Sequence, residues 1–281
     1  MQNHFNFIRK AKPDLDINDF QVLTSGWDND LYVVNGHLAF RFPKTRVVAE
    51  RVATEIRLLE SLRKPGELAL KVPEYHPWYE ISGELACVSY EFIFGTAFSG
   101  GLEERTEENA RKLGTFLSQL HRLTPPKGLV SKKKRDWETF YSDIQREILP
   151  HLTAADRNAV QTVFIRFLEN SVEEGQILLH GDLTASNIIC SAGQVTGVID
   201  FTDAHIGDPA FDFAGIYWNC GPEFTEQVLR YYSGESPGEL LRRVQQFYGL
   251  QPVFHELLYS IQQKHPVDWE HALDKFHALN K

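Results

Sequence analysis

Residues 180–187 read HGDLTASN, and residues 199–201 read IDF. The first stretch carries a carboxylate, Asp182, and an amide, Asn187, five positions later, and the second stretch adds the carboxylate of Asp200. Short apolar runs typical of buried strands flank both stretches. The sequence therefore predicts a β-hairpin that presents two carboxylates and an amide on neighbouring loops.

These residue types at this spacing indicate phosphoryl transfer. Mg²⁺ prefers oxygen ligands, takes few of them from the protein and leaves its other positions to phosphates and water. Transfer to an alcohol needs one carboxylate that orients the acceptor hydroxyl, and further oxygen ligands for the metal ions. Asp182, Asn187 and Asp200 supply this set of groups.

The chain around this motif divides into a β-rich part and a helical part. Before about residue 95, β-forming runs are separated by turns at Asn35-Gly36 and Ser82-Gly83, with one helical pattern at 46–63. Beyond that point the patterns are mostly helical, beginning after Thr106, a candidate N-cap. Further helices are expected at roughly 136–148, 153–170, 223–232, 237–248, 252–264 and 267–279.

This layout predicts an α+β fold with two lobes, arranged as in the kinases. The smaller lobe, residues 1–93, is expected to hold an antiparallel sheet with one helix and to bind the nucleotide. A hinge at about residues 90–96 leads to the larger, mostly helical lobe, residues 97–281, which is expected to bind the acceptor and carry catalysis.

Composition and charge narrow the possible functions. The chain has 281 residues, of which 42% are hydrophobic, enough for a full core without disulfides. A net charge of −9 argues against binding to nucleic acid or an anionic membrane. We find no secretory signal and no apolar run of spanning length, and we interpret Cys87, Cys190 and Cys220 as reduced core residues. We therefore expect a cytoplasmic monomer.

The motifs resemble those of the aminoglycoside phosphotransferases, antibiotic kinases that share the protein-kinase fold, and most closely the 2″-phosphotransferase branch. His-Gly-Asp at 180–182 and Ile-Asp-Phe at 199–201 replace the kinase motifs His-Arg-Asp and Asp-Phe-Gly, and GDPAFDFA follows at 207–214. The resemblance implies ATP or GTP as donor, Asp182 as the catalytic carboxylate, and Asn187 and Asp200 as Mg²⁺ ligands. At an ordinary pKa, Asp182 would be ionised at pH 7.

The resemblance also implies a cation on the third strand that holds the nucleotide phosphates. Arg41 shares a strand face with Ala39 and is the first candidate, and Lys44, after Pro43, is the rival. Glu55, on the following helix, is expected to pair with that cation.

Two further segments are expected to contact the nucleotide. The turn that contains Ser25, Gly26 and Asn29 stands where kinases place a glycine-rich loop over the phosphates. The segment Glu91-Phe92-Ile93 would be the hinge whose backbone groups contact the purine.

For the acceptor, the resemblance implies Asp203 as a carboxylate that contacts antibiotic amines. Where the 2″ enzymes carry an acid-rich insertion after Asp212, this chain has few carboxylates, and Glu223 is a further candidate contact and Trp218 a candidate for stacking on a sugar or macrolide. Trp218 is alternatively a core aromatic residue, and Lys132–Arg135 is interpreted as a solvated basic face. The preferred function is aminoglycoside phosphorylation. The alternatives are a macrolide 2′-phosphotransferase, a kinase for a sugar or amino alcohol, and a pseudokinase that only binds nucleotide.

We interpret two more residues of the motif region as structural. His180 is expected to fix the catalytic loop by hydrogen bonds and not to transfer protons. Asp212 is expected to cap or bond the same loop.

Overall fold

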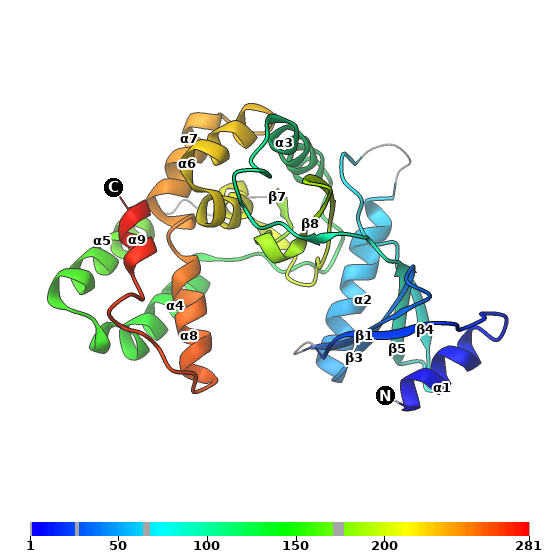
Figure 1. Ribbon diagram of the computed structural model, residues 1–281. Coiled ribbons are helices and arrows are strands. Elements are labelled where there is room, and N and C mark those ends of the chain that lie inside the picture. The colour runs from blue at the N-terminus through cyan, green and yellow to red at the C-terminus, as the bar shows by residue number, and fades with distance from the viewer. Residues whose placement is uncertain (1, 26–27, 64–67, 171–176, 281) are drawn as a thin grey trace.

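The computed structural model describes residues 2–25, 28–63, 68–170 and 177–280. Figure 1 shows a smaller part built on a twisted sheet and a larger, mainly helical part, connected by the chain after residue 91. This is the two-lobed arrangement that the sequence predicts.

The sheet of the smaller lobe has the order β1-β2-β3-β5-β4, and every neighbouring pair is antiparallel. Its strands are β1 (Phe20–Ser25), β2 (Asn29–Val34), β3 (Leu38–Pro43), β4 (His76–Tyr79) and β5 (Leu85–Glu91). The turn between β2 and β3 uses Asn35 at φ 51° and Gly36 at φ 68°. Two consecutive left-handed residues are what a tight hairpin of this twist requires, so the predicted hairpin is confirmed.

Each face of this sheet packs against a helix. On one face, α2 (Arg46–Ser61) buries Val48 and Val52 in a core that includes Ala39 of β3. On the other face, α1 (Gln2–Ala11) places Ile8 in a separate cluster with Phe42 and neighbouring aromatic side chains. The sequence predicts α2 but not α1, so the structure adds one helix to this lobe.

The larger lobe is built from seven α-helices among the residues that the structure describes. They are α3 (Glu107–His121), α4 (Lys134–Glu147), α5 (Ala154–Asn170), α6 (Ala214–Arg230), α7 (Pro237–Arg243), α8 (Pro252–Gln262) and α9 (Asp274–Leu279). Thr106 caps α3 by accepting a hydrogen bond from the Asn109 N–H at 3.2 Å, as predicted.

Two helix boundaries differ from the sequence prediction. Helix α6 starts nine residues before the predicted 223 and bends at Gly221, which has φ 79°. Residues 267–273 are not helical, because the Asp268 carboxylate accepts hydrogen bonds from the N–H groups of Glu270 and His271 and so caps a local turn.

Short strands position the motif loops in the larger lobe. Strands β8 (Ile188–Ser191) and β9 (Gln194–Val198) form the predicted hairpin, and β6 (Thr96–Ala97) pairs with β8. Strand β7 (Ile177–Leu179) pairs with β10 (His205–Gly207). The two motif loops therefore follow directly after β7 and β9.

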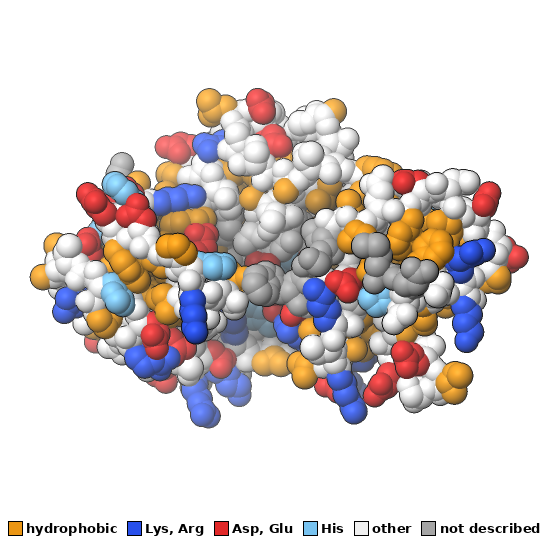
Figure 2. Space-filling view, turned by 60° about the horizontal axis from the view of Figure 1, so that its bottom comes forward, with side chains coloured by type: hydrophobic (Ala, Val, Ile, Leu, Met, Phe, Trp, Pro, Cys, Tyr) orange, Lys and Arg blue, Asp and Glu red, His pale blue; other side chains and the backbone are white. Residues whose placement is uncertain are grey.

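The state of the cysteines and the character of the surface follow the expectations drawn from the composition. Cys87, Cys190 and Cys220 are free and buried, which confirms the prediction of reduced core thiols. Acidic, basic and hydrophobic side chains are interspersed over the face shown in Figure 2. No helix in the described ranges combines the length and apolar character needed to cross a bilayer.

Candidate active site

The loop at 180–187 is fixed by hydrogen bonds to the buried carboxylate of Asp212. Asp212 accepts hydrogen bonds from the backbone N–H groups of His180 at 2.8 Å and Gly181 at 2.9 Å, and from His121 Nε2 at 3.0 Å. Burial alone would raise the pKa of Asp212, but these bonds hold it below its ordinary value. The predicted loop-bonding role of Asp212 is confirmed.

His180 fixes the same loop through its ring. Its Nδ1 accepts from the Asp182 N–H at 3.2 Å, and its Nε2 donates to the Ile199 carbonyl at 3.1 Å. Burial lowers the pKa of His180, so the ring is neutral in this arrangement. The side chain joins the two motif loops, which confirms the predicted structural role.

Gly181 allows the turn after Asp200 to approach the catalytic loop. It has φ 84°, and a Cβ there would overlap the Asp203 carbonyl oxygen. Only glycine combines this backbone conformation with so close an approach. The exposed Asp203 consequently stands beside the loop that carries Asp182.

Asp182 and Asn187 are brought together as the sequence predicts. Asn187 Nδ2 donates to both the backbone carbonyl and Oδ2 of Asp182, each at 2.8 Å. Burial and the nearby carboxylates of Asp203 and Asp200 raise the pKa of Asp182 to about 6. The expectation of an ordinary pKa is therefore wrong, although the carboxyl group is still mostly ionised at pH 7.

Asp200 occupies a strained turn at the end of β9. Its φ is 65°, a conformation that residues other than glycine adopt rarely, and such strain is concentrated at functional sites. Its Oδ1 accepts from Thr202 Oγ1 at 2.6 Å and from Arg41 Nη2 at 3.3 Å. Burial opposes the charge, but Arg41 and Thr202 hold the pKa of Asp200 below its ordinary value.

Arg41 and Glu55 form the ion pair that the sequence predicts. Arg41 Nη1 lies 3.1 Å from Glu55 Oε2, and both side chains are buried. Glu55 also accepts from the Phe201 N–H at 3.0 Å, and its Oε2 lies 3.1 Å from Thr202 Oγ1, whose one hydrogen is donated to Asp200. The pair therefore connects β3 and α2 of the smaller lobe to the Asp200 turn of the larger one.

Of the remaining phosphate candidates, Asn29 contacts Arg41. Asn29, with its amide turned to satisfy its hydrogen bonds, accepts through Oδ1 from Arg41 Nη2 at 3.0 Å and Nε at 3.1 Å. Lys44 is exposed and lies 3.3 Å from Asp30 Oδ1. Ser25 ends β1, and Gly26 lies outside the described residues. Contact of these residues with nucleotide phosphates stays a prediction.

The hinge segment is only partly available for a purine. Glu91 ends β5, opposite Leu38, and the Phe92 N–H donates to the His37 carbonyl at 2.8 Å. That donor is therefore engaged inside the sheet. Ile93 packs against Gly197 of β9, where a Cβ would come within 2.8 Å of Ile93 Cγ2.

The acceptor candidates differ in exposure. Trp218 is 8% exposed, belongs to the core, and has Lys275 Nζ 4.4 Å from its ring centroid. This burial supports the core role for Trp218, because a stacked ligand needs an open ring face. Glu223 is exposed, just beyond the bend of α6.

The structure also shows two contributors that sequence reasoning missed. Tyr75 donates to Glu55 Oε1 at 3.1 Å and accepts from Arg41 Nη1 at 2.8 Å. Thr202 bonds to Asp200, Glu55 and Arg41. The position of Thr202 next to the Ile-Asp-Phe motif was a usable signal, whereas nothing in the sequence around Tyr75 indicates its partners.

The donor set at Asn187 and Asp200 fits a magnesium ion. Asn187 uses its Nδ2 for both hydrogen bonds to Asp182, which leaves its Oδ1 for another partner, and the Asp200 carboxylate is a hard oxygen ligand. No group of three or more His, Cys, Asp or Glu side chains in the described ranges could hold a metal. Two oxygens are sufficient for Mg²⁺ when phosphates supply further ligands.

Comparison with known proteins gives a consistent assignment. Residues 19–247 match the phosphotransferase enzyme family abbreviated APH. The Bacillus subtilis protein YcbJ is 26% identical over 81% of this chain and 76% of its own length. Viomycin phosphotransferase of Streptomyces vinaceus is 24% identical over 70% of this chain and 72% of its own.

Solved structures of antibiotic phosphotransferases share the fold, and two of them illustrate it. Wild-type aminoglycoside 2′-phosphotransferase-IIIa, in complex with GDP, superposes with a TM-score of 0.82 at 23% identity and covers 99% of this chain and 98% of its own. A macrolide 2′-phosphotransferase from Brachybacterium faecium gives 0.69 at 20% identity, with 98% and 97% covered. The match over residues 19–247 shows that the chain belongs to the APH phosphotransferase family of small-molecule kinases.

Proposed function

We propose that the protein transfers the γ-phosphoryl group of ATP or GTP to a hydroxyl group of an aminoglycoside antibiotic, in the presence of Mg²⁺. The observation that carries this proposal is the network in which Arg41, paired with Glu55 at 3.1 Å, also reaches Asp200 at 3.3 Å. This network sets the Arg41 guanidinium, the proposed phosphate-binding cation, beside the Asp200 carboxylate, the proposed metal ligand. Both lie next to the loop that carries Asp182 and Asn187.

In this proposal Asp182 orients the acceptor hydroxyl and accepts its proton. A carboxyl group with a pKa of about 6 is a stronger base than an ordinary aspartate and remains mostly ionised at pH 7. Because the transition state of phosphoryl transfer is loose, orientation is the larger part of this role. The bond from Asn187 Nδ2 to Asp182 Oδ2 fixes the direction of the carboxylate.

Asn187 and Asp200 would hold Mg²⁺, which neutralises charge on the phosphates when it is bound. Arg41 would contact the phosphates from β3, with Asn29 beside it. The purine would lie against the backbone of Glu91 and Ile93, since the Phe92 N–H is already engaged. We also propose that the protein acts as a monomer in the cytoplasm.

The choice of acceptor rests on the exposed carboxylates. Asp203 stands next to the catalytic loop, and Glu223 is exposed on α6, so a cationic acceptor has two anionic partners to approach. A macrolide would depend more on an aromatic contact, and the buried Trp218 gives less support for it. A sugar or amino alcohol remains the second alternative within the kinases.

Radiolabelled phosphate transfer tests the proposal. Purified protein is incubated with γ-labelled ATP or GTP and with kanamycin, erythromycin or a panel of sugars and amino alcohols, with Mg²⁺ present or chelated. We expect Mg²⁺-dependent labelling of the aminoglycoside. Labelling of erythromycin or of a sugar would assign the alternative acceptors, and nucleotide binding without any transfer would assign a pseudokinase.

A further inference from the structure

Thr202 stands in the Asp200 turn, at the position where the kinase motif Asp-Phe-Gly has its glycine. Its hydroxyl lies between two charged groups. Oγ1 donates to Asp200 Oδ1 at 2.6 Å and accepts from Arg41 Nη2 at 2.9 Å. A glycine could make neither bond. The side chain of Thr202 therefore adds contacts to this turn that the kinase motif lacks.

The hydroxyl makes a closer contact with each charged group than the two groups make with each other. Arg41 Nη2 lies 3.3 Å from Asp200 Oδ1, which is longer than either hydrogen bond of Thr202. A neutral hydroxyl that donates to a carboxylate fixes its direction without cancelling its charge. The Asp200 carboxylate is therefore held in place while its charge is kept for a cation.

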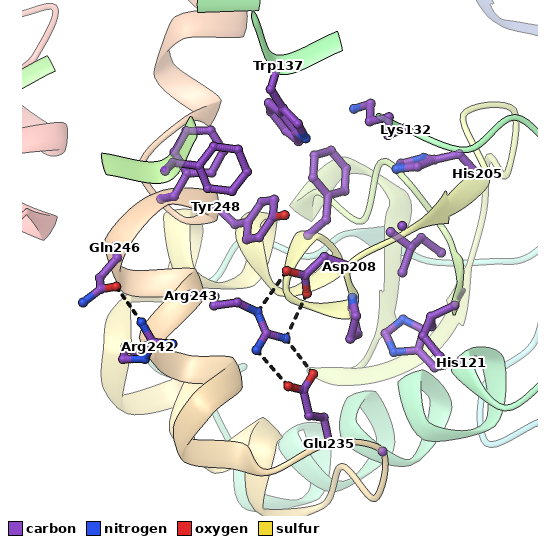
Figure 3. Close-up of a pocket in the computed structure, with 18 of the residues that line it drawn as sticks. His121, Lys132, Trp137, His205, Asp208, Glu235, Arg242, Arg243, Gln246 and Tyr248 are labelled. Atoms are coloured by element: carbon purple, nitrogen blue, oxygen red, sulfur yellow. Dashed lines mark hydrogen bonds and ion pairs between the residues drawn. The ribbon is translucent and has the colours of Figure 1, made fainter. Parts of the chain in front are cut away.

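Arg243, in the larger lobe, shows a different arrangement of an arginine that faces two carboxylates (Figure 3). Its Nε and Nη2 donate to Asp208 at 2.9 Å and 3.0 Å, and Nη2 also donates to Glu235 at 2.6 Å. The guanidinium thus bonds both carboxylates directly and at short distance. The hydroxyl between Arg41 and Asp200 is therefore a feature of the Asp200 turn, and an arginine that faces two carboxylates does not require it.

The Asp200 side chain is the open member of its network. It is 45% exposed, whereas the side chains of Arg41 and Glu55 are 10% and 0% exposed. An exposed carboxylate has room for a metal ion, but it also has room to rotate, and ordering it on binding costs free energy. The hydrogen bond from Thr202 reduces this freedom before any ion binds.

We propose that Thr202 is a positioning residue for the metal ion: its hydroxyl holds Asp200 Oδ1 and so orients the carboxylate that binds Mg²⁺. The inference rests on one part of the proposed function, the binding of Mg²⁺ with the nucleotide, and does not depend on the acceptor. Removal of a group that orients a metal ligand typically weakens metal binding about ten- to a hundredfold.

Mn²⁺ is the probe, because electron paramagnetic resonance measures its binding to the protein and a non-hydrolysable ATP or GTP analogue without turnover. Thr202→Val should weaken Mn²⁺ binding about tenfold or more, because it keeps the shape of the side chain and removes the hydroxyl. Thr202→Ser keeps the hydroxyl and should stay within about threefold of wild type. Thr162→Val is the matched control: this exposed threonine of α5 donates to the Asn158 carbonyl at 2.7 Å, and its loss should leave Mn²⁺ binding unchanged.

Nucleotide binding in the presence of EDTA distinguishes positioning of the metal ligand from general support of the fold. The affinity of Thr202→Val for the analogue without metal should stay within about threefold of wild type, because Arg41 keeps its bonds to Glu55 and Tyr75. Equal weakening of Mn²⁺ binding and of metal-free nucleotide binding would overturn the proposal. Thr202→Ala gives an independent variant if Thr202→Val fails to fold.

The remaining outcomes separate this inference from the proposed function. Unchanged Mn²⁺ affinity in Thr202→Val or Thr202→Ala, or a loss that also occurs in Thr202→Ser, would overturn the positioning role alone. If the wild type binds Mn²⁺ with the nucleotide analogue and phosphorylates no antibiotic, the acceptor assignment fails and the role of Thr202 stands. A wild-type protein that binds no Mn²⁺ with either analogue would overturn both.

Discussion

The Arg41 guanidinium lies 3.1 Å from the Glu55 carboxylate, with both side chains buried between the lobes. Tyr75, Thr202 and the Phe201 N–H complete the hydrogen bonds of the pair. A buried charge pair is tolerated only when its remaining donors and acceptors are satisfied, as they are here. The arginine fork matches this need better than a lysine, because it reaches several acceptors at once.

Glu55→Gln should destabilise the fold. The change removes one of the two carboxylates that face the buried Arg41 charge and leaves Asp200 at 3.3 Å as the other, so the cost is up to about 3–5 kcal/mol, the figure for breaking a buried pair. Urea unfolding monitored by circular dichroism measures the loss. Glu50→Gln is the control, because Glu50 is exposed on the same helix and its pair with Arg46 should contribute less than about 1 kcal/mol. Equal losses in the two variants would contradict the role of the buried pair.

Nucleotide kinetics distinguish the two candidate phosphate-binding cations. Arg41→Met should raise the KM for the nucleotide about tenfold or more, since a charged contact to phosphate is worth about 1.5–3 kcal/mol. Lys44→Met should change the same KM less than about threefold, because Lys44 is exposed at the lobe surface. The opposite order would assign the phosphates to Lys44.

Asp203→Asn should weaken acceptor binding and leave the donor unaffected. Losing one charge-assisted hydrogen bond to an ammonium group raises the aminoglycoside KM about ten- to a hundredfold. The nucleotide KM should stay nearly constant, and the loss should be largest at low salt. Initial rates at varied acceptor and varied donor separate the two constants, and equal changes in both would argue against an acceptor contact.

Asp212 should make stability depend on pH in the acidic range. The pKa of Asp212 in the folded protein is below the ordinary value of about 3.9. The ionised carboxylate therefore contributes fully to the free energy of unfolding above about pH 4, and this contribution is lost as the pH falls through the folded-state pKa. Asp212→Asn should therefore lose about 1.5–3 kcal/mol at pH 7, the usual worth of a hydrogen bond to a charged group, and the gap to wild type should narrow below about pH 4. Urea unfolding across pH measures the gap, with the exposed Asp14→Asn as control. A gap that does not change with pH would contradict this assignment.

Local patterns were sufficient to predict the motif loops and most helices. The order of Asp182, Asn187 and Asp200 along the chain, with apolar strands around them, is visible in the sequence because the loops and their hairpin are contiguous. The Arg41–Glu55 pair was also predictable, since a strand and the next helix carry it.

Tertiary contacts explain what the sequence did not reveal. Helix α1 is stabilised by the burial of its Ile8 and by the stacking of its His4 on Phe42 of β3. These contacts join segments that are far apart in the sequence. Lys132 is half-buried, with its Nζ 4.2 Å from the ring centroid of Phe211, far along the chain, whereas residues 133–135 of the same basic run are exposed as the sequence predicts. The raised pKa of Asp182 likewise depends on its burial in the folded chain and on the approach of Asp203 across Gly181.

The central claim is that Asp182 is the catalytic carboxylate, and a single-turnover assay of Asp182→Asn tests it most directly. The amide keeps the shape of the side chain, and Asn187 and Asp200 remain, so the affinity for Mg²⁺ and nucleotide should stay within about threefold of wild type. The rate of phosphoryl transfer to the acceptor should fall about 100- to 10,000-fold. A transfer rate close to that of wild type, in a variant with normal nucleotide binding, would contradict the account.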